Sequence, residues 1–183
     1  MDFPKVKSMT IPEGTVKKIE VGGVVLWKSG YTNLVPLSTE TDGKTIYNGG
    51  KGYKDGYRVR SGGAEGGSTY CTCTGYIPYK QGDKLYIYPP FTGLNTENAI
   101  NFYDSDFKCL GQITDAGNVY GFCNSTFKTK VENGVSVLDI SAVTVSGVAD
   151  IAYVRITNRI KSSGAAIQSG AEMIITKNEE ITQ

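Results

Sequence analysis

Between residues 150 and 157, apolar residues alternate with polar and aromatic ones, and this pattern constrains the fold more than any other stretch of the chain. In an extended backbone successive side chains point to opposite faces, so a period of two indicates a strand with one face in a core. The β-branched and aromatic residues of this stretch favour the same structure. The positions expected to point inward are Ala152, Val154 and Ile156, and those expected to point outward are Ile151, Tyr153 and Arg155.

Residues 84–88 and 99–104 repeat this arrangement, and we interpret all three segments as neighbours in one sheet. The expected inward set is Leu85, Ile87, Ile100, Phe102, Val154 and Ile156. The expected outward set is Tyr86, Tyr88, Asn101, Tyr103, Tyr153 and Arg155. The sheet would then bury one face in the core and present a polar and aromatic face to solvent.

The rest of the chain predicts an all-β fold. Short strand-like segments recur at the spacing of hairpins, glycine-rich turns separate them, and no segment shows the period of an amphipathic helix. This organisation is typical of an antiparallel β-sandwich, and we expect one of the jelly-roll type over residues 31–183. A chain of 183 residues is long enough for one such domain and its core, with a smaller unit in front of it.

Residues 1–30 form that smaller unit. The strand-like segments 16–21 and 24–27 flank a Gly-Gly pair, which favours a β-hairpin, and residues 7–11 suggest a third strand. Strands this short bury too little surface to be stable alone, so the unit must lean on the following domain or on another chain. The residues expected to make a docking contact are Ile19, Val21 and Trp27, the last being the only tryptophan.

Charge and hydropathy exclude several classes of partner. The 19 basic and 18 acidic residues are interspersed, so there is no basic stripe for nucleic acid or an anionic membrane. No apolar run approaches the roughly 20 residues of a membrane-spanning helix. Residues 1–7 lack the apolar region of a secretion signal, so we expect no signal peptide.

The chain contains no histidine, and this limits its chemistry. Nucleophiles activated by histidine, and most zinc, copper and iron sites, need an imidazole. We therefore expect no catalytic residue, no cofactor and no metal site, and an enzyme would have to work with carboxylates, lysine or tyrosine.

The cysteines stand at positions 71, 73, 109 and 123, which is not the spacing of a zinc knuckle. We expect reduced thiols in or near the core, while a disulfide between Cys109 and Cys123 stays open. The acidic pair Asp104 and Asp106 fits a turn better than a calcium loop, because the later ligands of such a loop are missing. Whether calcium binds there also stays open.

Two sets of segments resemble a known family. Residues 8–14, 16–19 and 24–27 resemble a short module of tail and minor structural proteins from phages and prophages of Gram-positive bacteria. A second set resembles the jelly-roll modules of the same proteins: Tyr76–Pro78, Gly82–Asp83, Phe102–Phe107 and Ala152–Ile156. The resemblance implies a galactose-binding-like carbohydrate-binding domain in a virion tail-tip or baseplate protein. Such a protein is made in the bacterial cytoplasm and has other tail subunits, or sister chains in a homo-oligomer, as partners.

The outward face then predicts a site for host cell-surface carbohydrate. Flat rings suit the C–H side of a sugar, and planar polar groups suit paired hydroxyls. The rings would come from Tyr86, Tyr103 and Tyr153, and the planar polar groups from Asn101 and Arg155. Two alternatives stay open: the tyrosines face another subunit in a purely structural protein, or carboxylates from distant strands form a glycosidase site.

Overall fold

The computed structural model describes residues 18–21, 24–28, 31–91, 99–114, 119–121, 130–139, 150–159 and 170–181. These residues form a three-stranded, a seven-stranded and a four-stranded sheet, and every described strand pair is antiparallel. Within the described ranges the helical elements are short 3₁₀ turns. The prediction of an all-β antiparallel fold is confirmed. No helix of the described ranges has both the length and the apolar character needed to cross a membrane.

The seven-stranded sheet runs in the order β10-β9-β8-β13-β5-β4, and β6 also pairs with β13. Its strands are β4 (Tyr53–Val59), β5 (Glu65–Thr74), β6 (Ile77–Pro78), β8 (Ala99–Tyr103), β9 (Cys109–Thr114), β10 (Val119–Gly121) and β13 (Tyr153–Arg159). The central pair β8 and β13 aligns Val154 with Phe102 and Arg155 with Asn101. The prediction that these two segments are sheet neighbours is confirmed.

The four-stranded sheet runs in the order β11-β12-β7-β14. Its strands are β7 (Lys84–Tyr88), β11 (Lys130–Glu132), β12 (Val135–Asp139) and β14 (Ile174–Lys177). The prediction that residues 84–88 lie in the same sheet as the other two segments is therefore wrong. Its alternating pattern fits either sheet of a sandwich, because the inward residues of both sheets enter one core.

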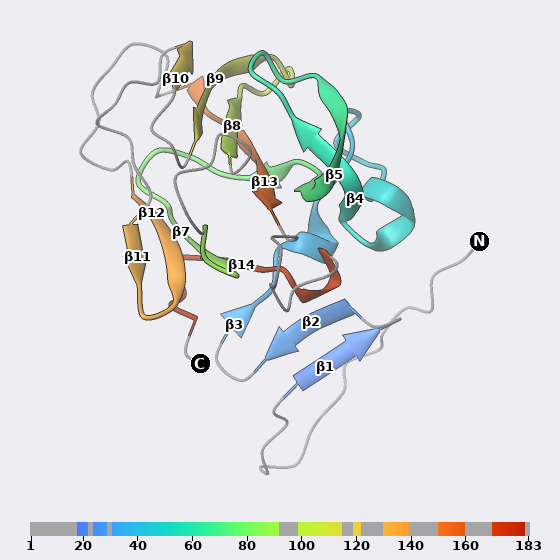
Figure 1. The fold of residues 1–183 in the computed structure, drawn as a ribbon, viewed down its shortest axis with the longest axis vertical. Helices are drawn as coiled ribbons and strands as arrows, with labels where there is room; N and C mark the ends of the chain where they lie inside the picture. The colour runs from blue at the N-terminus through green and yellow to red at the C-terminus, as the bar shows by residue number, and fades with distance from the viewer. Residues whose placement is uncertain are drawn as a thin grey trace.

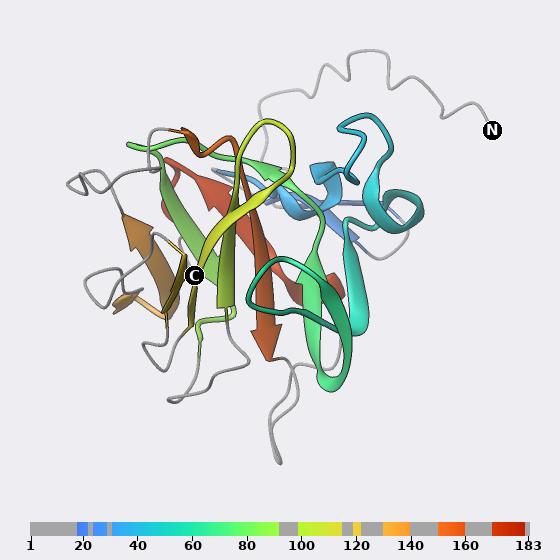
Figure 2. The same ribbon diagram turned by 90° about the horizontal axis from the view of Figure 1, so that it is seen from above.

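One hydrophobic core joins the two larger sheets, whose arrangement can be followed in Figure 2. The six residues predicted to point inward all belong to it with 0% exposure: Leu85, Ile87, Ile100, Phe102, Val154 and Ile156. At about 25 cal/mol per Å² of buried apolar area, such contacts are the main stabilisation of a domain of this size. The prediction is confirmed for these six residues. It is wrong at the start of the 150–157 segment, because β13 begins only at Tyr153. Ile151, expected to point outward, is 4% exposed and belongs to the core, whereas Ala152, expected to point inward, is half-buried.

The small sheet contains β1 (Lys18–Val21), β2 (Val24–Lys28) and β3 (Tyr31–Thr32), in that order. Ile19 pairs with Trp27 and Val21 with Val24, so the predicted hairpin is confirmed. The sheet lies at one end of the molecule (Figure 1), where β2 contacts the 3₁₀ turns η1 (Val35–Leu37) and η4 (Gly170–Glu172) and β3 lies beside β14. The unit thus leans on its own sandwich. The strand expected at residues 7–11 lies outside the described residues.

The boundary at residue 30 stays a prediction, although β3 extends the small sheet to Thr32. Docking of this unit to a partner through Ile19, Val21 and Trp27 also stays a prediction. Cys71 and Cys73 are buried free thiols and Cys109 is a half-buried one. This agrees with the expectation of reduced cysteines, and Cys123 lies outside the described residues.

Candidate functional site

The outward face of β8 and β13 is covered by the chain itself. The exposed fraction is 0% for Asn101, 1% for Tyr103 and 3% for Arg155, and Tyr153 is half-buried. The expectation that these side chains form an open surface is wrong. Alternation along a strand shows which residues share a face, but it does not show whether another segment lies on that face.

The turn between β4 and β5 makes part of this cover. The Arg60 carbonyl accepts a hydrogen bond from Asn101 Nδ2 at 3.0 Å, and the Gly63 carbonyl accepts one from the Tyr103 hydroxyl at 3.4 Å. Gln112 Nε2 donates to Asn101 Oδ1 at 2.9 Å. Buried polar groups need such partners, and the turn satisfies groups that the sequence pattern assigned to a ligand.

Aromatic rings make the rest of the cover. Phe107 stacks on Tyr153 with ring centroids 4.8 Å apart, and Tyr76 meets Tyr103 edge-on at 4.8 Å. Tyr76 also meets Phe107 at 4.9 Å. The tyrosine faces are therefore occupied by rings of the same chain, in the geometries that aromatic pairs prefer.

Tyr86 lies elsewhere. It is half-buried on β7 in the four-stranded sheet, where it packs against a second apolar cluster made by Val135, Val137, Ile174 and Ile181. The structure therefore brings Asn101, Tyr103, Tyr153 and Arg155 to one covered face and separates Tyr86 from them. The five residues do not form one site.

Arg155 instead organises a polar cluster at the edge of this covered face. Its Nη2 donates to Glu65 Oε1 at 2.6 Å and to the Tyr47 hydroxyl at 3.3 Å, and its Nε donates to the Thr74 carbonyl at 2.9 Å. The Tyr47 hydroxyl donates to Glu65 Oε1 at 2.7 Å, and Lys54 Nζ lies 3.1 Å from Glu65 Oε2. Because its charge-assisted hydrogen bonds come from several segments, the carboxylate is held in one orientation.

These contacts set the protonation of the cluster. Burial alone would raise the pKa of the Glu65 carboxyl, but the hydrogen bonds from Arg155 and Tyr47 outweigh burial and lower the pKa to about 2. Burial also opposes the charge of Arg155, but its neighbours Cys73 and Tyr103 and its hydrogen bond to Glu65 raise its pKa. Near neutral pH the pair is a guanidinium and a carboxylate.

A cavity of about 150 Å³ opens beside this pair, and we call it the Arg155 cavity. Its lining residues are Glu40, Thr41, Tyr47, Glu65, Tyr76 and Arg155. Glu40 and Thr41 are exposed at the rim, whereas Tyr47 and Tyr76 are buried. The cavity therefore offers a carboxylate, a guanidinium, hydroxyls and flat rings within a small volume.

Sequence reasoning singled out Arg155 but missed the rest of this cavity. Glu65 stands 90 residues before Arg155, inside a glycine-rich stretch without any binding motif. Tyr47 and Glu40 come from the loop before β4, which no periodic pattern connects to β13. Only the three-dimensional fold brings these groups together.

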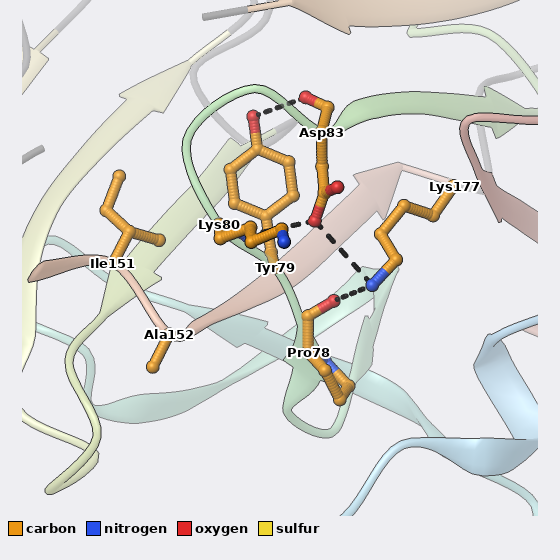
Figure 3. A pocket seen from close by; sticks show the side chains of 7 residues that line it. All are labelled: Pro78, Tyr79, Lys80, Asp83, Ile151, Ala152 and Lys177. Carbon is orange, nitrogen blue, oxygen red and sulfur yellow. Dashed lines mark hydrogen bonds and ion pairs between the residues drawn. The ribbon is translucent and has the colours of Figure 1, made fainter. Parts of the chain in front are cut away.

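A second and larger cavity of about 320 Å³ lies near the start of β13, and we call it the Lys177 pocket (Figure 3). Its lining residues are Pro78, Tyr79, Lys80, Asp83, Ile151, Ala152 and Lys177. Lys177 reaches from one side toward Asp83 and the Pro78 carbonyl, while Ile151 and Ala152 lie on the opposite side. Sequence reasoning did not find this cavity either.

The acidic segment at Asp104 is a turn in which the carboxylate binds backbone N–H groups of the same segment. Its carboxylate accepts hydrogen bonds from the backbone N–H groups of Asp106 at 3.0 Å and Lys108 at 2.9 Å, which is how aspartate stabilises a turn. The interpretation as a turn is confirmed. Within the described ranges, no group of three or more acidic, cysteine or histidine side chains is placed to hold a metal ion.

Comparison with known proteins identifies no relative of this chain. No protein-family model, no curated protein and no solved structure matches this chain. The two cavities and the resemblance of the sequence segments are therefore the observations from which a function can be inferred.

Proposed function

We propose that this protein is a non-enzymatic, carbohydrate-binding component of a phage or prophage tail or baseplate, and that the Arg155 cavity is its saccharide site. The observation that carries the proposal is the convergence of the ionised Arg155–Glu65 pair with the rings of Tyr47 and Tyr76 at one opening. Hydroxyl groups of a sugar donate to carboxylates and accept from guanidinium groups. The buried rings of Tyr47 and Tyr76, over which the Arg155 guanidinium lies, form the wall of the cavity.

The cavity is ordered before any ligand arrives. Arg155 is held by Thr74 and Glu65, and Glu65 is held in turn by Tyr47 and Lys54. Little side-chain entropy is lost when a ligand binds groups that are already fixed. A volume of about 150 Å³ is smaller than a typical drug-sized pocket, so the site takes one end or edge of a sugar rather than a long oligosaccharide.

The path of the chain supports a jelly roll of the galactose-binding-like kind. The chain passes from β7 in the four-stranded sheet to β8 and β9 in the seven-stranded sheet, and later from β12 to β13 to β14. Repeated crossing between two antiparallel sheets is a feature of Greek-key sandwiches, the group to which jelly rolls belong. The tail location, the cytoplasmic synthesis and the partner subunits follow from the resemblance of the N-terminal and sandwich segments to tail proteins.

Binding to immobilised host-envelope glycans tests the proposal. Glu40 lines the rim and is exposed, so Glu40→Gln changes the cavity without disturbing the core. Losing one hydrogen bond of about 0.5–1.5 kcal/mol corresponds to roughly 2–10-fold weaker binding. The matched control is Glu132→Gln, on exposed β11 outside the cavity. Absence of binding to any envelope glycan by the wild-type protein would leave a structural tail subunit.

The oligomeric state of the protein tests the alternative of a purely structural tail subunit. If a sister chain buried Tyr76 and the cavity rim, light scattering would detect an oligomer. Chemical labelling of the rim residues would then be blocked in that oligomer. A monomer with an accessible rim would favour a ligand-binding site.

A glycosidase is the second alternative, since Glu40 and Glu65 line the same cavity. A general acid needs a carboxyl whose pKa is raised, and the pKa of Glu65 is lowered to about 2. Both oxygens of Glu65 also carry hydrogen bonds from Arg155, Tyr47 and Lys54. Turnover of chromogenic glycosides that Glu40→Gln abolishes would nevertheless favour the enzyme.

A further inference from the structure

The Lys177 pocket lies apart from the Arg155 cavity and shares no lining residue with it. We propose that it is a second binding site, which takes an oxyanion, a carboxylate or a phosphate group, carried on a compact molecule. Its volume of about 320 Å³ is at the lower end of the range for small-ligand sites. The inference does not depend on sugar binding at the other cavity.

The Asp83 carboxylate is already satisfied by its own chain. It is buried, and its Oδ1 accepts a hydrogen bond from Asn178 Nδ2 at 3.0 Å. Its Oδ2 accepts one from the Lys80 backbone N–H at 3.1 Å and lies 3.6 Å from Lys177 Nζ. This buried carboxylate therefore positions Lys177 beside the pocket.

The Lys177 ammonium, in contrast, is held loosely. It lies 3.3 Å from the Pro78 carbonyl and 3.6 Å from Asp83 Oδ2, and both distances exceed the usual range for N–H···O hydrogen bonds. An ammonium group has three donors, and the side chain of Lys177 is 31% exposed. An oxygen atom of a ligand can therefore approach it from the cavity and make a shorter, charge-assisted bond.

The charges around the pocket favour an anion. Lys80 and Lys177 are two cationic lining residues, against the single buried carboxylate of Asp83. Asp150 is exposed next to Ile151 in the chain and does not line the pocket. The net local charge is positive, so a neutral or cationic ligand would gain less from the site than an oxyanion.

The walls of the pocket suit the body of such a ligand. Ile151 and Ala152 lie opposite Lys177, and Pro78 lies beside the Lys177 ammonium (Figure 3). These groups offer apolar contact to a ring or short chain while its anionic group meets the ammonium. The shared chemistry is thus an anionic oxygen group on a compact carrier, from either an acidic sugar or a phosphate-bearing compound.

The first experiment follows the backbone amide signals of Ala152 and Lys177 by NMR in the full-length protein. The probes are inorganic phosphate, D-glucuronate and the neutral control methyl glucoside. We expect saturable shifts with at least one anion, no shift with methyl glucoside, and weaker binding as salt rises from about 0.05 M to about 0.3 M. Tighter binding of phosphate points to a phosphate-bearing ligand, and tighter binding of glucuronate points to an acidic sugar.

Variants then locate the bound anion. Lys177→Gln should weaken binding at least tenfold and Lys80→Gln several-fold, while Lys130→Gln on exposed β11 leaves it unchanged. Lys177→Gln could unfold the protein because Asp83 would lose its cationic neighbour. In that case Lys80→Gln still tests the proposal, because Lys80 is exposed. The proposal would be overturned if neither phosphate nor glucuronate gave saturable shifts. Equal affinity in wild type and Lys80→Gln, or equally tight binding of methyl glucoside, would overturn it too.

Discussion

Arg155 Nη2 lies 2.6 Å from Glu65 Oε1, although the two residues are 90 positions apart in the chain. The guanidinium side chain is 4% exposed and the carboxylate side chain is 27% exposed, so the pair extends from the interior to the wall of a cavity. The period-two pattern on β13 predicted that Arg155 faces solvent. The contact shows that Arg155 instead holds the covering segment that contains Glu65. It also provides the charged groups on which the proposed saccharide site depends.

Removal of the Glu65 charge should destabilise the fold. Glu65→Gln leaves the buried Arg155 without its anionic partner, and a cost of about 1–3 kcal/mol in the free energy of unfolding is expected. Urea denaturation measures the change. Glu132→Gln on exposed β11 makes the same chemical substitution and should stay within about 0.5 kcal/mol of wild type. Equal stabilities of the two variants would mean that the Arg155–Glu65 pair contributes nothing.

The same pair predicts a pH dependence. The pKa of Glu65 falls from an ordinary value of 4.5 to about 2 in the folded protein. A depressed folded-state pKa stabilises the protein above pH 4.5, and this contribution is lost as the pH falls from 4.5 toward 2. The stability difference between wild type and Glu65→Gln should therefore shrink over that window. Asp42, whose pKa is also lowered to about 2 by hydrogen bonds from Thr45, is present in both proteins and cancels. A difference that is constant from pH 6 to pH 2 would contradict the assignment.

The sequence predicted the inward half of the strands and failed on the outward half, and the reason is physical. Burial of Val154 and Ile156 depends on a local alternation that any extended chain shows, so it can be read without the fold. The partners of Asn101 and Arg155 are the carbonyl of Arg60 and the carboxylate of Glu65, which come from a distant hairpin. Such contacts leave no periodic signal.

The incorrect assignment of residues 84–88 to the sheet of β8 and β13 has a related cause. Leu85 and Ile87 alternate with tyrosines just as the residues of β8 and β13 alternate with polar side chains. In a sandwich both sheets show this pattern toward one core, so the pattern predicts the buried face and cannot choose the sheet. Both cavities are likewise built by segments that meet only in the folded chain, and the sequence provided one lining residue, Arg155, in advance.

The turn that covers the outward face should tolerate no side chain at Gly63. This residue has a φ of +90°, and an added Cβ would lie 2.8 Å from Cys109 Cβ and 3.1 Å from the Tyr103 ring. Gly63→Ala should lower the free energy of unfolding by about 1–3 kcal/mol, through backbone strain and crowding. Gly67 has open space around its Cβ position, and Gly67→Ala should change stability by less than about 1 kcal/mol. Comparable losses in the two variants would show that Gly63 is not the constrained position.

Thiol chemistry should be suppressed in the native protein. Burial raises the pKa of Cys73 to about 11, and Cys71, two positions earlier in the chain, is fully buried. Since the thiolate is the reactive form, iodoacetamide at pH 8 should label neither residue until urea is added. Peptide mass spectrometry reads out each site separately, and half-buried Cys109 serves as the internal comparison. Rapid labelling of Cys73 in the folded protein would contradict its placement in the core.

Substitution of Tyr153 and of Glu40 should separate stability from binding. The Tyr153 ring stacks on Phe107, so Tyr153→Ala removes an intramolecular contact and should lower stability by about 1–3 kcal/mol. It does not line the Arg155 cavity, and the folded variant should keep its affinity for envelope glycans. Glu40→Gln should do the reverse and weaken glycan binding with unchanged urea midpoint. Calorimetric titration of both variants, at a temperature where each is fully folded, makes the comparison. Loss of binding in Tyr153→Ala with full affinity in Glu40→Gln would move the saccharide site from the cavity to the aromatic cover around Phe107.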